Sequence, residues 1–394
     1  METTRSRRTL LACLTLMGVG FSVLFPILTP VGRQLGLNEI QITSIISVSS
    51  LTVFLATPRW GRLSDRLGRK PIILIGLFGF SIGTFLFNVI LELGLSAKLS
   101  GLHLFFALLL ARICHASIMS AAMPAATAYM ADITDIGSRT QGMGAAGAAN
   151  NLGSIVGPAL SGLAIIYLLL PLWLVGFLAF LNGLFALRFL PPSPRGREEK
   201  QNIVKLRYSD GRILPFIITG VALFTGFAIV QQTMGFKFQD SLALSTAETS
   251  AVFGSALVLS AITALVSQVF IVQRIKTEPI ALIQIAMPIL ILAFILMAFS
   301  ETRLPLTVAF GIMGLGMGLA TPGLMAGASL AVPAENQGAV AGLAASCGPL
   351  GFTLGPLIGG AIYQFSPTAT YLFAASIYFL LFVFVGKLEK SRRC

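Results

Sequence analysis

The chain carries few charged residues. The largest cluster of charged side chains, which could do chemistry together, lies in one short stretch. Residues 61–71 read G-R-L-S-D-R-L-G-R-K-P and hold a single acid, Asp65. The basic residues in and beside this stretch are Arg59, Arg62, Arg66, Arg69 and Lys70. Because an arginine and a carboxylate form strong hydrogen bonds of defined geometry, the stretch could form an ion-pair latch around Asp65.

A second group that could do chemistry is Arg112 with His115, inside a long apolar run. At a rise of about 1.5 Å per residue, Arg112 would lie about 16 Å from the start of its helix. A charge buried in a membrane is costly, and it is a functional candidate by default. His115 follows on the same helix face, and an imidazole can gain and lose a proton near neutral pH. The alternative is a histidine that is only hydrogen-bonded inside a helix bundle.

The composition indicates a membrane protein. Of 394 residues, 55% are hydrophobic and 11% are charged, and the mean hydropathy is +0.87, whereas a soluble protein needs more charge to cover its surface. The net charge of +12 would suit nucleic acid, but its distribution follows membrane topology instead. The four cysteines show no metal or redox spacing. We find no Walker loop, metal cluster or nucleophile triad, so we expect no cofactor, no metal, no ATP-driven pumping and no enzymatic activity.

Twelve apolar segments are long enough to cross a bilayer, which takes about 20 residues each. The first has no small-residue cleavage site, so we interpret it as a retained span rather than a signal peptide. The longest polar segment, 191–212, is basic and predicts a linker between two six-helix halves, 1–190 and 213–394. The predicted spans are 9–31, 41–58, 71–95, 101–131, 142–167, 170–190, 213–236, 247–272, 279–299, 304–328, 338–362 and 367–386.

The positions of lysine and arginine predict the orientation in the membrane. With both termini in the cytoplasm, 22 of the 27 lysines and arginines fall on the cytoplasmic side. Four fall outside: Arg33, Lys98, Lys237 and Arg303. Arg112 remains, inside a span. We therefore expect a multi-pass protein of the cytoplasmic (inner) membrane with both termini cytoplasmic.

The two halves share an internal repeat. Adding 198 to positions in the fourth and fifth segments reaches matching residues in the tenth and eleventh: Pro124 and Pro322, Gly144 and Gly342, Gly153 and Gly351, Gly157 and Gly355, Pro158 and Pro356, Gly162 and Gly360. Chance alignment of a glycine-rich chain is the alternative, and the two proline pairs argue against it. Corresponding helices interrupted by proline and glycine are typical of secondary transporters built from parallel repeats, which hold their substrate between the repeats near the bilayer midplane.

Residues 61–71 resemble the signature G-x-L-a-D-r-x-G-r-k between the second and third helices of the major facilitator superfamily. The matching residues are Gly61, Leu63, Asp65, Arg66, Gly68, Arg69 and Lys70. The run A-Y-M-A-D-I-T-D and Arg112 resemble the twelve-helix drug:proton antiporter (tetracycline-efflux-like) branch. By this resemblance Asp65, Arg69 and Asp132 form a cytoplasmic gate latch, and Asp65 also faces the N-terminus of the eleventh helix, whose partial positive charge attracts a carboxylate. The alternative to a latch is that these charged residues are solvated and only set the membrane topology.

The fifth segment carries a glycine–proline motif, G-S-I-V-G-P-A-L-S-G at 153–162. Glycine at four-residue spacing lets helix backbones approach closely, and proline bends a helix. The motif resembles the G-x-x-x-G-P-x-x-G-G signature of export-type proton antiporters, with Ser161 in place of one glycine. A second copy of the motif at 351–360 weakens its value as evidence for the direction of transport. The alternative is that both copies serve only for generic close packing of helices. The predicted packing residues are Gly153, Gly157, Pro158, Gly162, Gly351, Gly355, Pro356 and Gly360.

The resemblance places Arg112 beside a central substrate cavity, where relatives usually have Gln-Gly in place of His115 and Ala116. No Asp or Glu lies in mid-membrane, and Met17 stands where efflux relatives often carry an acid. A cavity with one fixed positive charge favours neutral, zwitterionic or anionic amphipathic molecules. We expect a pliable apolar wall, although lipid-facing or packing roles are the alternative for its residues. The predicted wall residues are Phe21, Phe25, Met313 and Met317.

We therefore predict an all-α polytopic membrane protein with the major facilitator fold. The predicted activity is secondary active export of a small amphipathic organic compound, such as an antibiotic or an exported metabolite like a siderophore. A lipid-handling flippase and a proton-symport importer are the alternatives, and a non-transporting receptor fits least. The expected partners are a small-molecule substrate, protons and the lipid bilayer, with no nucleic acid, and we expect a monomer. Protons could couple at Asp132, by breaking its pair with Arg69, or at His115, where a proton and an anion would bind together.

Overall fold

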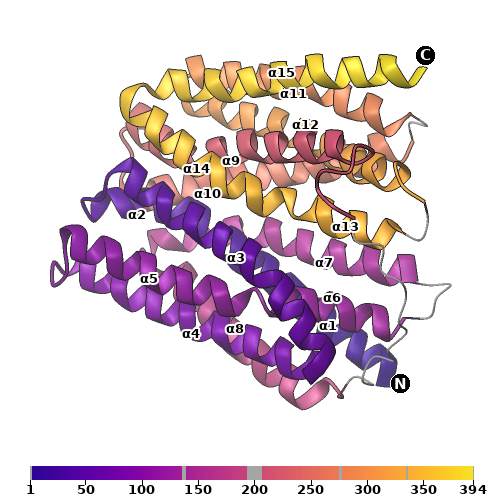
Figure 1. The fold of residues 1–394 in the computed structure, drawn as a ribbon. Coiled ribbons are helices and arrows are strands. Elements are labelled where there is room, and N and C mark those ends of the chain that lie inside the picture. The colour runs from indigo at the N-terminus through magenta and orange to yellow at the C-terminus, as the bar shows by residue number, and fades with distance from the viewer. Residues whose placement is uncertain (1, 135–138, 193–205, 275–276, 334–335, 394) are drawn as a thin grey trace. The chain divides into compact units, whose positions relative to one another are not determined.

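The computed structural model describes residues 2–134, 139–192, 206–274, 277–333 and 336–393. Within these ranges every regular element is a helix (Figure 1). The chain divides into two compact units, the first made of residues 1–199 with 245–254 and the second of residues 200–244 with 255–394. The predicted linker at 191–212 falls largely on residues 193–205, which lie outside the described ranges.

The first unit holds six helical segments, three of which are broken once. A break after Ser22 divides the first segment, and a break after Met119 divides the fourth. The fifth segment ends in a short 3₁₀ helix, Ser161–Ile165. The helices are α1 Glu2–Ser22, α2 Leu24–Gln34, α3 Glu39–Leu67, α4 Arg69–Leu95, α5 Gly101–Met119, α6 Ala122–Asp132, α7 Arg139–Leu160 and α8 Leu170–Phe189.

The second unit holds the remaining segments, except that the start of α10, residues 245–254, groups with the first unit. A π-helical turn, Ser267–Val272, follows α10, and the eleventh segment is broken at Ser346. The helices are α9 Leu214–Leu242, α10 Thr246–Val266, α11 Pro279–Phe299, α12 Arg303–Leu330, α13 Gln337–Ala345, α14 Cys347–Phe365 and α15 Pro367–Arg393.

Eleven of these helical segments are long and apolar enough to cross a membrane within the described residues. The segment that is not among them is α7 with its 3₁₀ extension, whose first half is dominated by glycine, alanine and asparagine. The sequence analysis counted this segment as the span 142–167, and the repeat supports it as the twelfth helix independently of its hydropathy. The predicted all-helical fold with twelve helices is confirmed.

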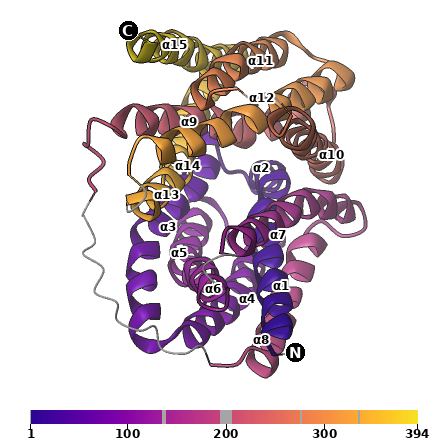
Figure 2. The same ribbon diagram turned by 90° about the vertical axis from the view of Figure 1, so that its right-hand side faces the viewer.

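The same helix pairs form inside each unit. In the first unit α1 packs against α7, and α4 packs against α5 and α8; Figure 2 shows α1 beside α7. In the second unit α9 packs against α14, and α11 packs against α12 and α15. The repeat seen in the sequence thus corresponds to a repeated packing scheme.

Glycines make the closest of these contacts. A Cβ added at Gly157 on α7 would lie 2.6 Å from the carbonyl oxygen of Val19 on α1, and one added at Gly355 on α14 would lie 2.6 Å from that of Thr225 on α9. Gly153 and Gly351 also approach the backbone of the facing helix. Gly162 has open space around it. The close approach expected from the glycine spacing is therefore present in both units.

The predicted spans 41–58 and 71–95 place residues 61–67 in a loop between two helices, and this expectation is wrong. Residues 61–67 do not form a loop, because α3 continues through them to Leu67. The only break before α4 is Gly68, whose φ of +96° lies in a region that residues with a side chain rarely adopt. Charge alone does not end a helix, so the positions of Asp65 and Arg69 are fixed by helices rather than by a flexible loop.

Candidate functional site

Arg69 is the centre of an ion-pair network at one end of the first unit. Its Nη1 pairs with the carboxylate of Asp65, its Nε donates to Oδ2 of Asp132 at 3.1 Å, and its Nη1 also donates to Oγ of Ser64 at 2.8 Å. The Arg69 side chain is 14% exposed, whereas Asp65 is 61% exposed and Asp132 25%. The structure thus brings together the three residues of the predicted latch.

The local fold explains why these side chains meet. Asp65 lies in the last turn of α3, the turn at Gly68 reverses the chain, and Arg69 is the first residue of α4. Asp132 is the last residue of α6. The network therefore joins the ends of three helices. Gly61 has open space around it, and the predicted approach of Asp65 to the helix that begins near residue 338 stays a prediction.

A polar pocket lies in the interior of the first unit. It has an empty volume of about 290 Å³, including its open side. Four of its lining side chains are polar and mostly apolar residues complete its walls. The lining residues are Gly20, Val23, Leu24, Phe80, Thr84, Phe87, Asn88, Arg112, His115, Leu172 and Val175. No carboxylate is among them.

Arg112 and His115 form a hydrogen-bonded pair in this pocket. The Nη1 of Arg112 lies 2.8 Å from Nδ1 of His115, and since a guanidinium can only donate, the Nδ1 accepts. A neutral imidazole then carries its hydrogen on Nε2. The guanidinium carbon lies 5.5 Å from the centre of the Phe87 ring, and the His115 ring packs against Phe80 at 5.1 Å between centres. Arg112 is 8% exposed and His115 is 4% exposed, so the surrounding protein holds both side chains in place.

Several polar atoms of the pocket have no hydrogen-bond partner. They are Nε of Arg112, Nε2 of His115, Oγ1 of Thr84, and both Nδ2 and Oδ1 of Asn88. Thr84 and Asn88 are one turn apart on α4, so they lie on one face of that helix. The sequence analysis missed both residues. Their four-residue spacing in an apolar run was the available signal.

The other predicted cavity residues lie elsewhere. Phe21 and Phe25 pack edge to face at 5.3 Å between ring centres, with Phe21 42% exposed and Phe25 buried, and neither lines the pocket of Arg112. Met313 and Met317 are buried on α12 of the second unit. Their role in a substrate cavity stays a prediction.

A buried lysine is a third residue that the sequence analysis missed. Lys237, counted there on the outer side, lies inside α9 and is 5% exposed. Helix α9 continues to Leu242, six residues beyond the predicted end of that span. Arg112 is therefore accompanied by another buried cation, in the second unit.

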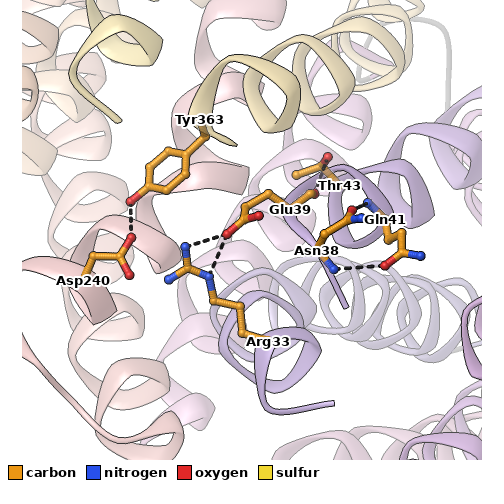
Figure 3. Close-up of polar contacts among 7 residues, drawn as sticks. All are labelled: Arg33, Asn38, Glu39, Gln41, Thr43, Asp240 and Tyr363. Carbon is orange, nitrogen blue, oxygen red and sulfur yellow. Dashed lines mark hydrogen bonds and ion pairs between the residues drawn. The ribbon is translucent and has the colours of Figure 1, made fainter. Parts of the chain in front are cut away.

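The remaining acids near helix ends are engaged in local contacts. On α4, Glu92 accepts hydrogen bonds from the hydroxyl of Tyr167 and, at 3.4 Å, from Nε1 of Trp173. In the second unit the hydroxyl of Tyr363 donates to Oδ2 of Asp240 at 2.8 Å (Figure 3). These contacts give both acids structural roles at their helix ends.

The turn between α2 and α3 is also held by polar contacts, drawn in Figure 3. Arg33 donates to Oε1 of Glu39 at 2.7 Å. The side chain of Asn38 accepts from the backbone of Gln41 at 2.8 Å, and the Gln41 side chain accepts from the backbone of Asn38 at 3.0 Å. This reciprocal capping box satisfies the free N–H groups at the start of α3.

In the helix-packing motif, Ser161 occupies the position of a family glycine. Its hydroxyl lies 2.6 Å from the carbonyl oxygen of Pro158 and 2.9 Å from that of Ser250, to which it can donate.

No group of three or more metal-ligating side chains occurs among the described residues.

The chain matches the family described as Major Facilitator Superfamily over residues 10–348 and 285–393. It is similar along nearly its full length to Multidrug resistance protein 1 of Bacillus subtilis (strain 168), at 26% identity over 372 residues, covering 93% of this chain and 91% of the relative. It is similar to the quinolone resistance protein NorA of Staphylococcus aureus (strain COL) at 24% identity over 387 residues, covering 96% and 95%.

Solved structures show the same fold. A bacterial homologue of the human lysosomal transporter Spinster, in an inward-facing and occupied conformation, aligns with a TM-score of 0.75 at 14% identity, covering 98% of this chain and 96% of that one. A mutant of the nucleoside transporter NupG aligns with a TM-score of 0.76 at 14% identity, covering 98% and 99%. The chain belongs to the Major Facilitator Superfamily, and it is a multi-pass secondary transporter rather than an enzyme.

Proposed function

We propose that this protein exports a small amphipathic organic compound across the cytoplasmic membrane in exchange for protons. The observation that carries the proposal is the network in which Arg69 binds both Asp65 and Asp132. Because this network joins the ends of α3, α4 and α6, breaking it would release three helix ends at once. A latch that opens when a carboxylate is protonated would let a proton gradient act on the transport cycle.

Two facts support export rather than import. The full-length relatives described above are named for drug resistance, which efflux produces. The glycine–proline motif of export-type antiporters is also matched, and its Gly153 and Gly157 make the backbone contacts that the motif implies. In this proposal both termini are cytoplasmic, the latch is the inner gate, and the protein works as a monomer.

The polar pocket supports a substrate that is neutral, zwitterionic or anionic. Arg112 contributes a permanent positive charge, and no carboxylate lines the pocket. A lipophilic cation would therefore be repelled there, whereas a carboxylate would be attracted. A fluorescent quinolone is a suitable probe, because quinolones carry a carboxylate and one relative is named for resistance to them.

We assign proton coupling to Asp132. Protonation would remove the charge that holds Arg69, so a proton arriving at this site would open the latch that the empty, deprotonated protein keeps closed. Substrate binding and proton binding would then compete in the same gate state, which is the condition for exchange.

The buried Nε2 of His115 has no hydrogen-bond partner and can donate to a bound anion, which favours a second candidate, proton–anion symport. Because Nδ1 accepts from Arg112, an added proton would go to Nδ1 and replace that hydrogen bond. An anion beside Arg112 would offset the repulsion between that guanidinium and a proton on His115. Proton and anion would then bind together rather than compete, and both would move in the same direction.

Reconstituted vesicles with an imposed pH gradient separate the two candidates. Quinolone movement is measured in the wild type, His115→Gln and Asp132→Asn, both with the gradient and downhill without it. We expect Asp132→Asn to lose gradient-driven accumulation while it keeps downhill movement. Loss of gradient-driven transport in His115→Gln alone would overturn the assignment to Asp132 and establish symport through His115. Identifying which compounds accumulate in cells that lack the protein would define the natural substrate.

A further inference from the structure

The pocket inside the first unit has a charge and hydrogen-bond pattern that is incomplete without a ligand. Of its unpartnered atoms, Nε of Arg112, Nε2 of His115 and Nδ2 of Asn88 are hydrogen-bond donors. The Oδ1 of Asn88 is the one pure acceptor, and the Thr84 hydroxyl can serve either way. The pocket therefore presents an excess of donors.

The residues that carry these atoms are fixed by their surroundings. Asn88 is fully buried, and Thr84, Arg112 and His115 are all at least nine-tenths buried. The His115 ring lies against Gly83, where an added Cβ would come within 2.6 Å of its Cδ2. Donors held rigidly around one space form a preorganised site, because little freedom is lost when a ligand binds.

The positive charge of Arg112 lacks a counter-charge in the pocket. Within the described part of the chain, Arg112 forms no ion pair, and its guanidinium contacts His115 and the face of Phe87. The nearest acid along the Asn88 face of α4 is Glu92, one turn farther on, and it accepts from Tyr167 and Trp173. A buried charge without a partner is strongly unfavourable, so a mobile counter-ion would stabilise this arrangement.

The size of the pocket limits what that counter-ion can be. The centre of a water-sized sphere can occupy only about 20 Å³ of the pocket, whereas sites for whole drug-sized ligands span about 300–1,000 Å³. The walls are aromatic and aliphatic apart from the four polar side chains. A small group thus fits better than an entire amphipathic molecule.

We propose that this pocket binds a compact monovalent anion, the chemistry shared by a halide ion and by the carboxylate of an organic acid. Arg112, His115 and Asn88 donate to it, and Thr84 completes the ring. The inference deepens the proposed function by naming the charged group that the transporter recognises. It can be tested by binding alone, so its outcome is independent of whether transport is export and whether protons drive it.

The first test measures thermal unfolding of the purified full-length protein in detergent. Sodium chloride, sodium formate and sodium gluconate are compared at equal ionic strength, because gluconate is too large for the pocket. A ligand that binds only the folded state raises the melting temperature as its concentration rises above its Kd. We expect chloride, formate or both to raise the melting temperature in a saturable way relative to gluconate. Chloride alone would indicate a halide site, and formate would indicate a carboxylate site.

Variants locate the effect. Asn88→Leu and Thr84→Val remove polar atoms with little change of volume, and each should raise the apparent Kd for the anion about tenfold, which corresponds to about 1.4 kcal/mol. The matched control is Ser81→Ala on the same helix, because the buried Ser81 hydroxyl donates to the carbonyl of Gly176 at 2.8 Å and does not line the pocket. Ser81→Ala should keep the anion-dependent shift.

Crystals soaked in sodium bromide give a direct view, because bromide scatters anomalously. An anomalous peak beside Arg112 and Asn88 would support the proposal. If neither chloride nor formate stabilises the wild type beyond gluconate, or if the shift is equally strong in Asn88→Leu and Ser81→Ala, the proposal is wrong. The pocket then holds water only.

Discussion

Replacing Gly157 by alanine tests whether close packing of α7 on α1 is required for stability. An added Cβ would lie 2.6 Å from the carbonyl oxygen of Val19, whereas ordinary van der Waals contact begins at 3.4 Å. The backbone of α1 would therefore have to move away by about 0.8 Å, the difference between these two distances. A backbone carbonyl inside a packed helix cannot rotate aside as the end of a flexible side chain can.

The size of the effect follows from two opposing terms. Overpacking a well-packed site costs about 1–3 kcal/mol, and replacing glycine by alanine inside a helix returns about 0.5–1 kcal/mol. Gly147→Ala on the same helix is the matched control, because nothing lies within 4 Å of a Cβ added there. The difference between the two variants isolates the overpacking cost, about 1–3 kcal/mol. Gly355→Ala should cost as much, since its Cβ would lie 2.6 Å from the carbonyl oxygen of Thr225.

The measurement is the apparent melting temperature of each purified variant in detergent. One kcal/mol shifts the melting temperature by about 2–4 °C in domains of 150–250 residues. Gly157→Ala and Gly355→Ala should therefore melt roughly 2–12 °C below Gly147→Ala. Equal melting temperatures for Gly157→Ala and Gly147→Ala would refute the packing assignment.

Three further predictions concern charges. Asp65→Asn should lower quinolone transport about tenfold in well-expressed protein, because a hydrogen bond to a charged group contributes about 1.5–3 kcal/mol and Asp65 is partly exposed; near-normal transport would remove Asp65 from the latch. Arg112→Ala should abolish transport of anionic quinolones and Arg112→Lys should restore only part, because the guanidinium fork is lost; strong transport of lipophilic cations by the wild type would contradict this. Hydrogen bonds from Arg212 lower the pKa of Asp210 to about 2, so Asp210 stays ionised and paired with Arg212 at any pH well above that value. This ion pair therefore does not change between about pH 5 and 8, and Asp210→Asn should leave the pH profile of transport unchanged over that range.

Hydropathy and repeats were sufficient to predict the fold. Long apolar runs can only be helices in a bilayer, and the offset of 198 residues supports α7, which is less apolar than the other eleven spans require. The packing of α7 on α1 follows from the spacing of Gly153 and Gly157, since glycine at four-residue intervals lies on one helix face. These features depend on local pattern, which a sequence displays directly.

The interior pocket could not be predicted in the same way. Asn88 lies among apolar residues of α4, and which neighbours it meets depends on how α4, α5 and α8 pack together. Lys237 was assigned to the outside because charge usually marks the end of a span, but α9 continues beyond it and buries it. Likewise the basic stretch before Gly68 was expected to be a loop, although nothing but that glycine interrupts the helix. The last two errors have one cause: a charged residue was taken as evidence that the chain leaves the helix and faces solvent at that point.

The measurement that tests the central claim most directly is proton movement caused by substrate, without any imposed pH gradient. Purified protein is reconstituted into vesicles that contain a pH-sensitive dye, and a quinolone gradient is applied across the membrane. Exchange predicts that protons move against the direction of the quinolone, and that Asp132→Asn abolishes this proton movement while downhill quinolone movement continues. Protons that move in the same direction as the quinolone, or quinolone movement with no proton movement in the wild type, would contradict proton-coupled export.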